Sequence, residues 1–184
     1  MKMGDRRQSD RADRDCLGRL ARGDADALDE LYRRHSTTAW RHALWVTGSP
    51  ADADDVLQTV FVRLAGGGVD LLSVRSLRAY LGSMVRHEAV RVSRRAAAGP
   101  AESGIDPDAL LGDAPSGELA AERTLLAARI AELPADQREA LVLRVHGGFT
   151  FREIGRAAGV STFTAASRFR LALGRLRKAL GGDR

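Results

Sequence analysis

The chain has 184 residues, a length that suits one or two small domains; 44% of them are hydrophobic, 5% are aromatic, and the net charge is +5. The apolar residues are mostly alanine, leucine and valine, which favours helices over sheets, and no apolar run approaches the roughly 20 residues of a membrane span. A single cysteine excludes an internal disulfide framework, and the charged N-terminus lacks the apolar segment of a secretory signal, so we expect a cytoplasmic protein without membrane insertion.

The charge is unevenly distributed along the chain. Residues 63–95 contain seven arginines against two acids, and residues 150–184 contain eight basic residues against two acids. Between them, residues 98–122 contain six acids and no lysine or arginine. Two basic segments joined by an acidic one are compatible with two patches that face one polyanion. They are equally compatible with arginines that simply cover the solvated faces of helices.

The N-terminal half predicts a charged tail followed by helices. Residues 1–16 alternate in charge, and we expect a flexible tail there. Residues 17–97 carry helical apolar periodicity. The first helix is predicted to begin near Asp24, which is a suitable N-cap. A second start is stronger, because Ser49 can cap the helix and Pro50 then occupies its first position.

The helical pattern of the sequence is then interrupted twice. Gly66-Gly67-Gly68 ends one helical pattern, and another runs to residue 97. Residues 98–118 contain three of the five prolines and four glycines, which is the composition of a flexible linker. Helical periodicity returns in residues 119–184, so the sequence predicts an all-α protein of two small helical domains joined by a flexible acidic linker.

Near the C-terminus, capping and turn residues predict two helices joined by a short turn. Thr150 and Glu153 form a capping box, and the run GVST closes a tight turn in which Gly159 adopts a left-handed backbone and Ser161 caps the second helix. The second helix has apolar residues along one face and polar residues along the other. Its first turns contain small residues. This is the plan of a helix-turn-helix. The alternative is a helical hairpin of a bundle, whose exposed face also carries arginines.

With both halves considered, the sequence resembles a known family. The stretch ELPADQREALVLRVHGGFTFREIGRAAGVSTFTAASRFRLALGRLRKAL is similar to region 4 of bacterial sigma factors of the extracytoplasmic-function (ECF) group. Upstream, DELYRRH, SPADADDVLQTVFVRL and RSLRAYLGSMVRHEAVRVSRR look like regions 2.1, 2.2 and 2.3–2.4 in order. The resemblance covers roughly residues 24–97 and 119–180, and all of its motifs occur in sequence.

The resemblance implies a function. It implies that residues 17–97 are sigma region 2 and residues 119–184 are sigma region 4. A sigma factor binds core RNA polymerase through the β′ clamp helices and the β flap, and directs initiation at promoters by recognising −10 and −35 elements. It needs no cofactor, metal or catalytic residue of its own. The implied partners are core RNA polymerase, promoter DNA and an anti-sigma factor, and the implied location is the nucleoid when polymerase is bound.

The resemblance also assigns roles to individual residues. Those that match the polymerase-docking pattern are Asp55, Gln58 and Phe61. Those that would face the −10 element are Arg78, Tyr80, Arg86, His87, Arg91, Arg94 and Arg95. Those that would contact the −35 element are Phe151, Arg152, Thr164, Ser167, Arg168 and Arg170. Tyr80 could stack on an unpaired base or be a half-buried aromatic residue of the helix.

Some residues depart from the family pattern, and two other functions remain compatible with parts of the sequence. His87 and Arg91 stand where Asn and Asp are common, and Phe163 and Ala166 where Gly and a basic residue are common, so promoter preference is expected to differ. One alternative is a stand-alone helix-turn-helix regulator that binds an operator without polymerase. The weakest is a metal nuclease that would use the acidic cluster at residues 52–55.

Overall fold

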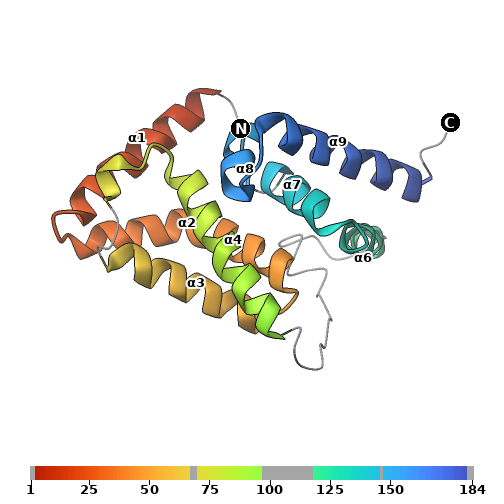
Figure 1. Cartoon of the computed structure of the whole chain (residues 1–184), viewed down its shortest axis with the longest axis horizontal. Helices are drawn as coiled ribbons and strands as arrows, with labels where there is room; N and C mark the ends of the chain where they lie inside the picture. Colours follow the sequence, from red (N-terminus) through yellow and green to blue (C-terminus); the bar gives the residue numbers. More distant parts are fainter. Residues whose placement is uncertain (1–2, 67–69, 97–117, 146, 182–184) are drawn as a thin grey trace.

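The computed structural model describes residues 3–66, 70–96, 118–145 and 147–181. The described residues form an all-α fold, as the sequence predicts, and contain no strand. A first group, which we call the N-terminal lobe, comprises α1 (Met3–Leu20), α2 (Ala25–Thr47), α3 (Pro50–Ala65), a short 3-10 helix η1 (Leu71–Ser73) and α4 (Leu77–Ala96). The C-terminal lobe comprises α6 (Glu118–Ala131), α7 (Ala135–Val145), α8 (Phe151–Ala158) and α9 (Thr162–Ala179). Figure 1 shows the two lobes side by side.

The predicted helix starts are confirmed by their capping geometry. Asp24 is the N-cap of α2 and accepts a hydrogen bond from the backbone N–H of Asp26. Ser49 caps α3 by accepting from the N–H of Asp52, with Pro50 in the first position of the helix. Such caps satisfy backbone donors that have no partner inside the helix, so short-range chemistry sets these boundaries.

The prediction of a flexible tail at residues 1–16 is wrong for the residues that the structure describes. Residues 3–16 belong to α1, which packs on α2 and buries Asp13, Cys16 and Leu17. Residues 1 and 2 lie outside the described part. The apolar residues that hold this helix stand at its C-terminal end, where the sequence pattern is too short to reveal an apolar stripe.

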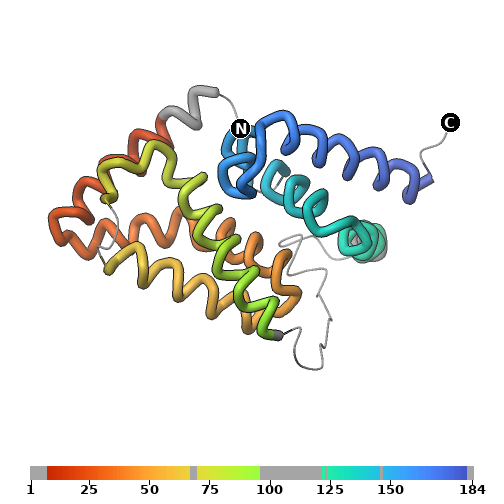
Figure 2. Tube along the Cα trace, viewed as in Figure 1, coloured from red at the N-terminus to blue at the C-terminus, as the bar shows by residue number. Residues whose placement is uncertain are grey.

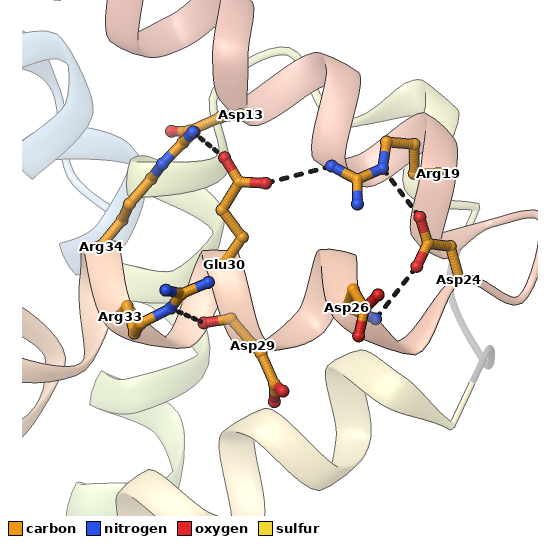
Figure 3. A network of polar contacts seen from close by, with 8 residues as sticks. All are labelled: Asp13, Arg19, Asp24, Asp26, Asp29, Glu30, Arg33 and Arg34. Atoms are coloured by element: carbon orange, nitrogen blue, oxygen red, sulfur yellow. Dashed lines mark hydrogen bonds and ion pairs between the residues drawn. The ribbon is translucent and has the colours of Figure 1, made fainter.

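Ion pairs join α1 to the start of α2. Figure 3 shows that Arg19 of α1 bridges two acids, lying 2.8 Å from Asp24 and 3.1 Å from Glu30. Arg34 of α2 reaches back to Asp13, with an Nη1–Oδ1 distance of 3.4 Å, and also pairs with Glu30. Exposed pairs contribute only about 0.2–1 kcal/mol each, whereas Asp13 of the pair with Arg34 is buried. Together these pairs orient α1 along α2.

The N-terminal lobe is a compact helical bundle. Helices α2, α3 and α4 pack mutually, and Figure 2 traces α4 across the other two. The expected glycine break is confirmed where α3 ends at Ala65 with Gly66 as its C-cap. The linker predicted at residues 98–118 lies outside the described residues except for Glu118, where α6 begins. Within the described part of the chain, no helix is long and apolar enough to cross a membrane.

The turn between α8 and α9 has the predicted chemistry. The capping box of Thr150 and Glu153 opens α8, and Gly159 ends it with a left-handed φ of 68°. Ser161 then caps α9 by accepting from the N–H of Thr164. The turn is closed by a 2.8 Å hydrogen bond from the N–H of Val160 to the carbonyl of Gly155. This close approach fixes the angle between the two helices.

Gly155→Ala should therefore destabilise the C-terminal lobe. A Cβ at this position would lie 2.7 Å from the carbonyl oxygen of Val160, and backbone cannot move aside cheaply. We expect the free energy of unfolding to fall by about 1–3 kcal/mol in urea denaturation. Gly174→Ala is the matched control, because no atom lies within 4 Å of its Cβ position and alanine is the better helix former, so stability should rise by up to about 1 kcal/mol. Equal effects of the two variants would contradict this account of the turn.

Candidate nucleic-acid interface

Helix α9 presents one face to its own lobe and the opposite face to solvent. Ala165, Ala172 and Leu176 are buried in the hydrophobic core, as the predicted apolar stripe required. At 100° per residue, the opposite face carries Phe163, Ser167 and Arg170. Phe163 and Arg170 are exposed and Ser167 is half-buried, so the surface predicted to contact DNA is open at its first and third turns.

Helix α8 adds two of the predicted residues at the edge of this face. Arg152 is exposed in its first turn. Phe151 is half-buried, with its ring 5.5 Å from that of Phe169 and the guanidinium of Arg144 4.9 Å above it. Phe151 therefore packs α8 against α9. Only the exposed part of its ring is left for the predicted contact with DNA.

Two other predicted residues are engaged within the lobe. The hydroxyl of Thr164 lies 2.8 Å from that of the capping residue Ser161. The Nε of Arg168 lies 3.0 Å from an Oδ2 of Asp136 on α7, and the arginine side chain is about three-quarters buried. Arg168 thus ties the recognition helix to α7, a structural role that the sequence did not predict.

On α3, the structure separates the three predicted docking residues. Asp55 and Gln58 are exposed on one face of the helix. Phe61 is only 6% exposed, because it lies in the hydrophobic core, and its ring also packs edge-on against the exposed Tyr32 at 4.9 Å between ring centroids. The prediction of Phe61 as a surface contact is therefore corrected: it supports the exposed pair from inside the lobe.

The seven residues predicted to face the −10 element all lie on α4. Near its C-terminal end, Arg94 and Arg95 are exposed, and Arg91 is exposed while paired with the buried Glu88. The hydrogen bond from Arg91 lowers the pKa of Glu88, and burial raises it. With the charges of the nearby guanidinium groups added, the pKa lies below its ordinary value. The C-terminal half of α4 is thus a strongly cationic surface.

Closer to the N-terminal end of α4, two of the residues predicted to face the −10 element line an open groove. Tyr80 is half-buried and His87 is exposed, and both line a groove between α3 and α4 that also includes Val62 and Met84. Burial raises the pKa of the Tyr80 hydroxyl. The groove is partly apolar and adjoins the cationic end of α4.

The remaining two residues, Arg78 and Arg86, are held by the C-terminal lobe. Arg78 donates a 2.9 Å hydrogen bond to the carbonyl of Gly147, and its guanidinium lies over the ring of Phe149 at 5.8 Å. The Nε of Arg86 lies 3.0 and 2.9 Å from the two carboxylate oxygens of Glu139 on α7. In this arrangement of the two lobes, which we call closed, both arginines are engaged by the C-terminal lobe, Arg78 through Nη1 and Arg86 through Nε.

Glu139 is the centre of the contact between the lobes. Its carboxylate is 7% exposed and also accepts a 3.0 Å hydrogen bond from Nε2 of His42, which is 2% exposed. Burial alone would raise the pKa of Glu139, but the hydrogen bonds and charges of His42 and Arg86 outweigh burial and hold the pKa below its ordinary value. The sequence gives no signal for this cluster, because 97 positions separate His42 from Glu139.

A second carboxylate reinforces the contact. Glu153, already part of the capping box of α8, accepts a 3.1 Å hydrogen bond from the hydroxyl of Ser76 at the start of α4. Burial raises the pKa of Glu153. The hydrogen bonds with Thr150 and Ser76 and the charge of Arg78 lower it by more, so the pKa lies below its ordinary value. At the same place Gly82 of α4 lets the ring of Phe149 approach closely.

Comparison with known families matches both lobes. The chain matches the family model for Sigma-70 region 2 over residues 31–98 and that for Sigma-70, region 4 over residues 123–176. It is 30% identical over 161 residues to the RNA polymerase sigma-E factor of Streptomyces avermitilis, covering 88% of this chain and 89% of the relative. It is 28% identical over 166 residues to the ECF RNA polymerase sigma factor SigL of Mycobacterium tuberculosis, covering 87% and 92%.

Two solved structures share the fold. CnrH in complex with the cytosolic domain of CnrY superposes with a TM-score of 0.69 at 22% identity, covering 94% of this chain and 99% of CnrH. The sigma factor RpoE of Bartonella quintana, in complex with the anti-sigma factor NepR, gives a TM-score of 0.57 at 23% identity, covering 84% and 99%. At these identities the likeness concerns the arrangement of the helices.

The charge of Glu139 should hold the lobes together in a pH-dependent way. Because its pKa is depressed in the folded chain, its stabilisation is complete above the ordinary carboxyl pKa of 4.5 and is lost as the pH falls through the lower folded value. Glu139→Gln should weaken the packing by about 1–3 kcal/mol at neutral pH, since the carboxylate that pairs with Arg86 is removed. Small-angle X-ray scattering should report a larger radius of gyration for this variant.

Glu132→Gln is the control for this measurement. Glu132 pairs only with its neighbour Arg129 at the surface, so its amide should leave the radius of gyration unchanged. If Glu139→Gln kept the wild-type radius and the wild-type response to acid, the carboxylate would not be what holds the lobes together.

Proposed function

The chain belongs to the extracytoplasmic-function group of bacterial sigma factors, and we propose that it binds core RNA polymerase and directs initiation at promoters that carry its −10 and −35 elements. The observation that carries the proposal is one chain with a helix-turn-helix in one lobe and, in the other, a cationic helix beside an exposed acid and amide pair. A stand-alone regulator leaves the exposed pair Asp55 and Gln58 on α3 without a role. The proposed place of action is the cytoplasm, at the nucleoid when polymerase is bound.

We assign the −35 element to the outward face of α9. Ser167 and Arg170 lie on this face, and Arg152 flanks it from α8. Arginine can bond guanine through two hydrogen bonds, and hydroxyl groups can reach base edges or phosphates in the major groove. Arg168, held by Asp136, acts from behind the helix by fixing its orientation.

We assign the −10 element to α4 and its groove. Arg91, Arg94 and Arg95 form a surface for phosphates, and Tyr80 and His87 line the apolar groove next to it. An unstacked base needs an aromatic or apolar surface beside a cationic one, and this combination supplies both. Asp55 and Gln58 on α3 remain for docking on the polymerase.

The closed arrangement implies a step before promoter binding. Arg78 and Arg86 are bound to Gly147 and Glu139, so separation of the lobes would free the nitrogens that these contacts occupy for DNA. The solved relatives CnrH and RpoE are bound by CnrY and NepR respectively. An anti-sigma factor that stabilises the closed arrangement is therefore a proposed partner of this chain, in addition to core RNA polymerase.

Reconstituted transcription tests the function. Adding the full chain to core RNA polymerase should give a stable complex and discrete run-off transcripts from genomic DNA, where core polymerase alone gives none. Absence of both the complex and the transcripts would rule out the sigma function. Specific binding to a palindromic operator without polymerase would support the regulator instead.

Asp55→Ala should weaken docking without affecting the fold. The exposed carboxylate contributes to a charged contact, so we expect about tenfold weaker binding to core polymerase, or about 1.4 kcal/mol, by fluorescence titration. The control is Asp15→Ala, which removes an equally exposed carboxylate from α1. If both variants bound as the wild type does, the assignment of this face of α3 would be wrong.

A further inference from the structure

The recognition helix carries a large apolar side chain where the fold gives it no partner. Phe163, the second residue of α9, is 75% exposed. We propose that its ring reads a thymine of the −35 element by contact with the C5-methyl group, and that it is a determinant of promoter specificity. The inference rests on the proposed function, and adds to it a residue and the base that this residue recognises.

The stability of the fold does not account for Phe163. Burying a phenylalanine side chain contributes about 1.5–3 kcal/mol, which this ring forgoes. It points away from Ala165 and Ala172, the residues that anchor the helix in the hydrophobic core. Its exposure leaves the ring free to contact a molecule outside the chain.

Two hydroxyl groups near Phe163 are already in use, whereas that of Ser167, four residues on, is assigned to DNA. The hydroxyls of Ser161 and Thr164 bond each other, and that of Ser161 also accepts from the N–H of Thr164. Ala166, one turn further along the same side, ends in a methyl group. In the first turn and a half of the helix, the ring of Phe163 is thus the longest side chain that can reach a base edge.

The surroundings of the ring indicate a nucleic-acid partner. Exposed arginines lie on both helices of the motif: Arg152 and Arg156 on α8, and Arg170 on α9. A protein partner that covered Phe163 would have to match this cationic rim, whereas phosphates of a DNA groove match it directly. The ring then faces base edges while the arginines face the backbone or a guanine.

In the major groove, the apolar group that distinguishes one base pair from the others is the thymine methyl. Phe163 and Arg170 stand seven residues apart on one face, about 10 Å along the helix axis. That length corresponds to about three base pairs of B-DNA. The proposal therefore also places the thymine about three base pairs from the base pair contacted by Arg170.

The test uses holoenzyme made from core polymerase and the full chain. A promoter library with a randomised −35 region is first selected by run-off transcription, which gives the preferred sequence and tests the proposed function independently. Each thymine of the selected −35 element is then replaced singly by deoxyuridine, which removes only the methyl group. For the wild type, one such replacement should weaken promoter binding about three- to tenfold.

The matching protein variant is Phe163→Ala. It should weaken binding to the thymine promoter by the same factor and be insensitive to the deoxyuridine replacement at that position. Phe163→Leu should retain most of the sensitivity. Arg170→Ala, as the control, should bind more weakly while keeping the full response to deoxyuridine.

Several results would overturn the proposal. They are a selected −35 element without a thymine, unchanged binding by Phe163→Ala, or equal losses by this variant on thymine and deoxyuridine promoters, which would indicate contact with the sugar-phosphate backbone. Loss of self-association by Phe163→Ala with unchanged DNA binding would assign the ring to a second copy of the chain instead. Failure of the wild type to select any promoter would remove the proposed function, and this inference with it.

Discussion

A buried carboxylate joins the two halves of this molecule. Glu139 of α7 accepts hydrogen bonds from His42 of α2 and Arg86 of α4, and all three side chains come from different helices. A buried charge is costly unless its partners stay in place, so the position of the C-terminal lobe depends on the N-terminal one. Arg78 on the carbonyl of Gly147 reinforces the same contact. The contact between the lobes thus depends on Arg78 and Arg86, the two arginines that are also proposed to contact DNA.

This double use explains how one chain could be both stable alone and competent on a promoter. Separation of the lobes releases Arg78 and Arg86 together, because both contacts lie between α4 and the C-terminal lobe. Polymerase and promoter DNA can offset the loss by binding the exposed surfaces of both lobes. A partner that binds across the closed lobes has the opposite effect, which is what the proposed anti-sigma factor requires.

The angle within the helix-turn-helix is set in large part by local contacts: the capping box of Thr150 and Glu153 and the hydrogen bond between Val160 and Gly155. The N-terminal lobe supports it, because α8 packs on α4 and Glu153 also accepts from Ser76. The outward face of α9 is exposed in the closed arrangement. A rigid helix suits recognition of the −35 element. Specificity then depends on the few side chains that project from the outward face of α9.

The sequence alone determined whatever rests on neighbours in the chain: the helix starts at Asp24, Ser49 and Thr150, the turn at Gly159, and the inward stripe of α9. Its resemblance to a family determined the function. Tertiary structure decided which of the named residues face solvent. It tied Arg168 to Asp136, packed α1 on α2, and joined the lobes at Glu139. The physical reason is range: caps and turns act over three or four residues, whereas burial and ion pairing join side chains that only the packing of helices brings together.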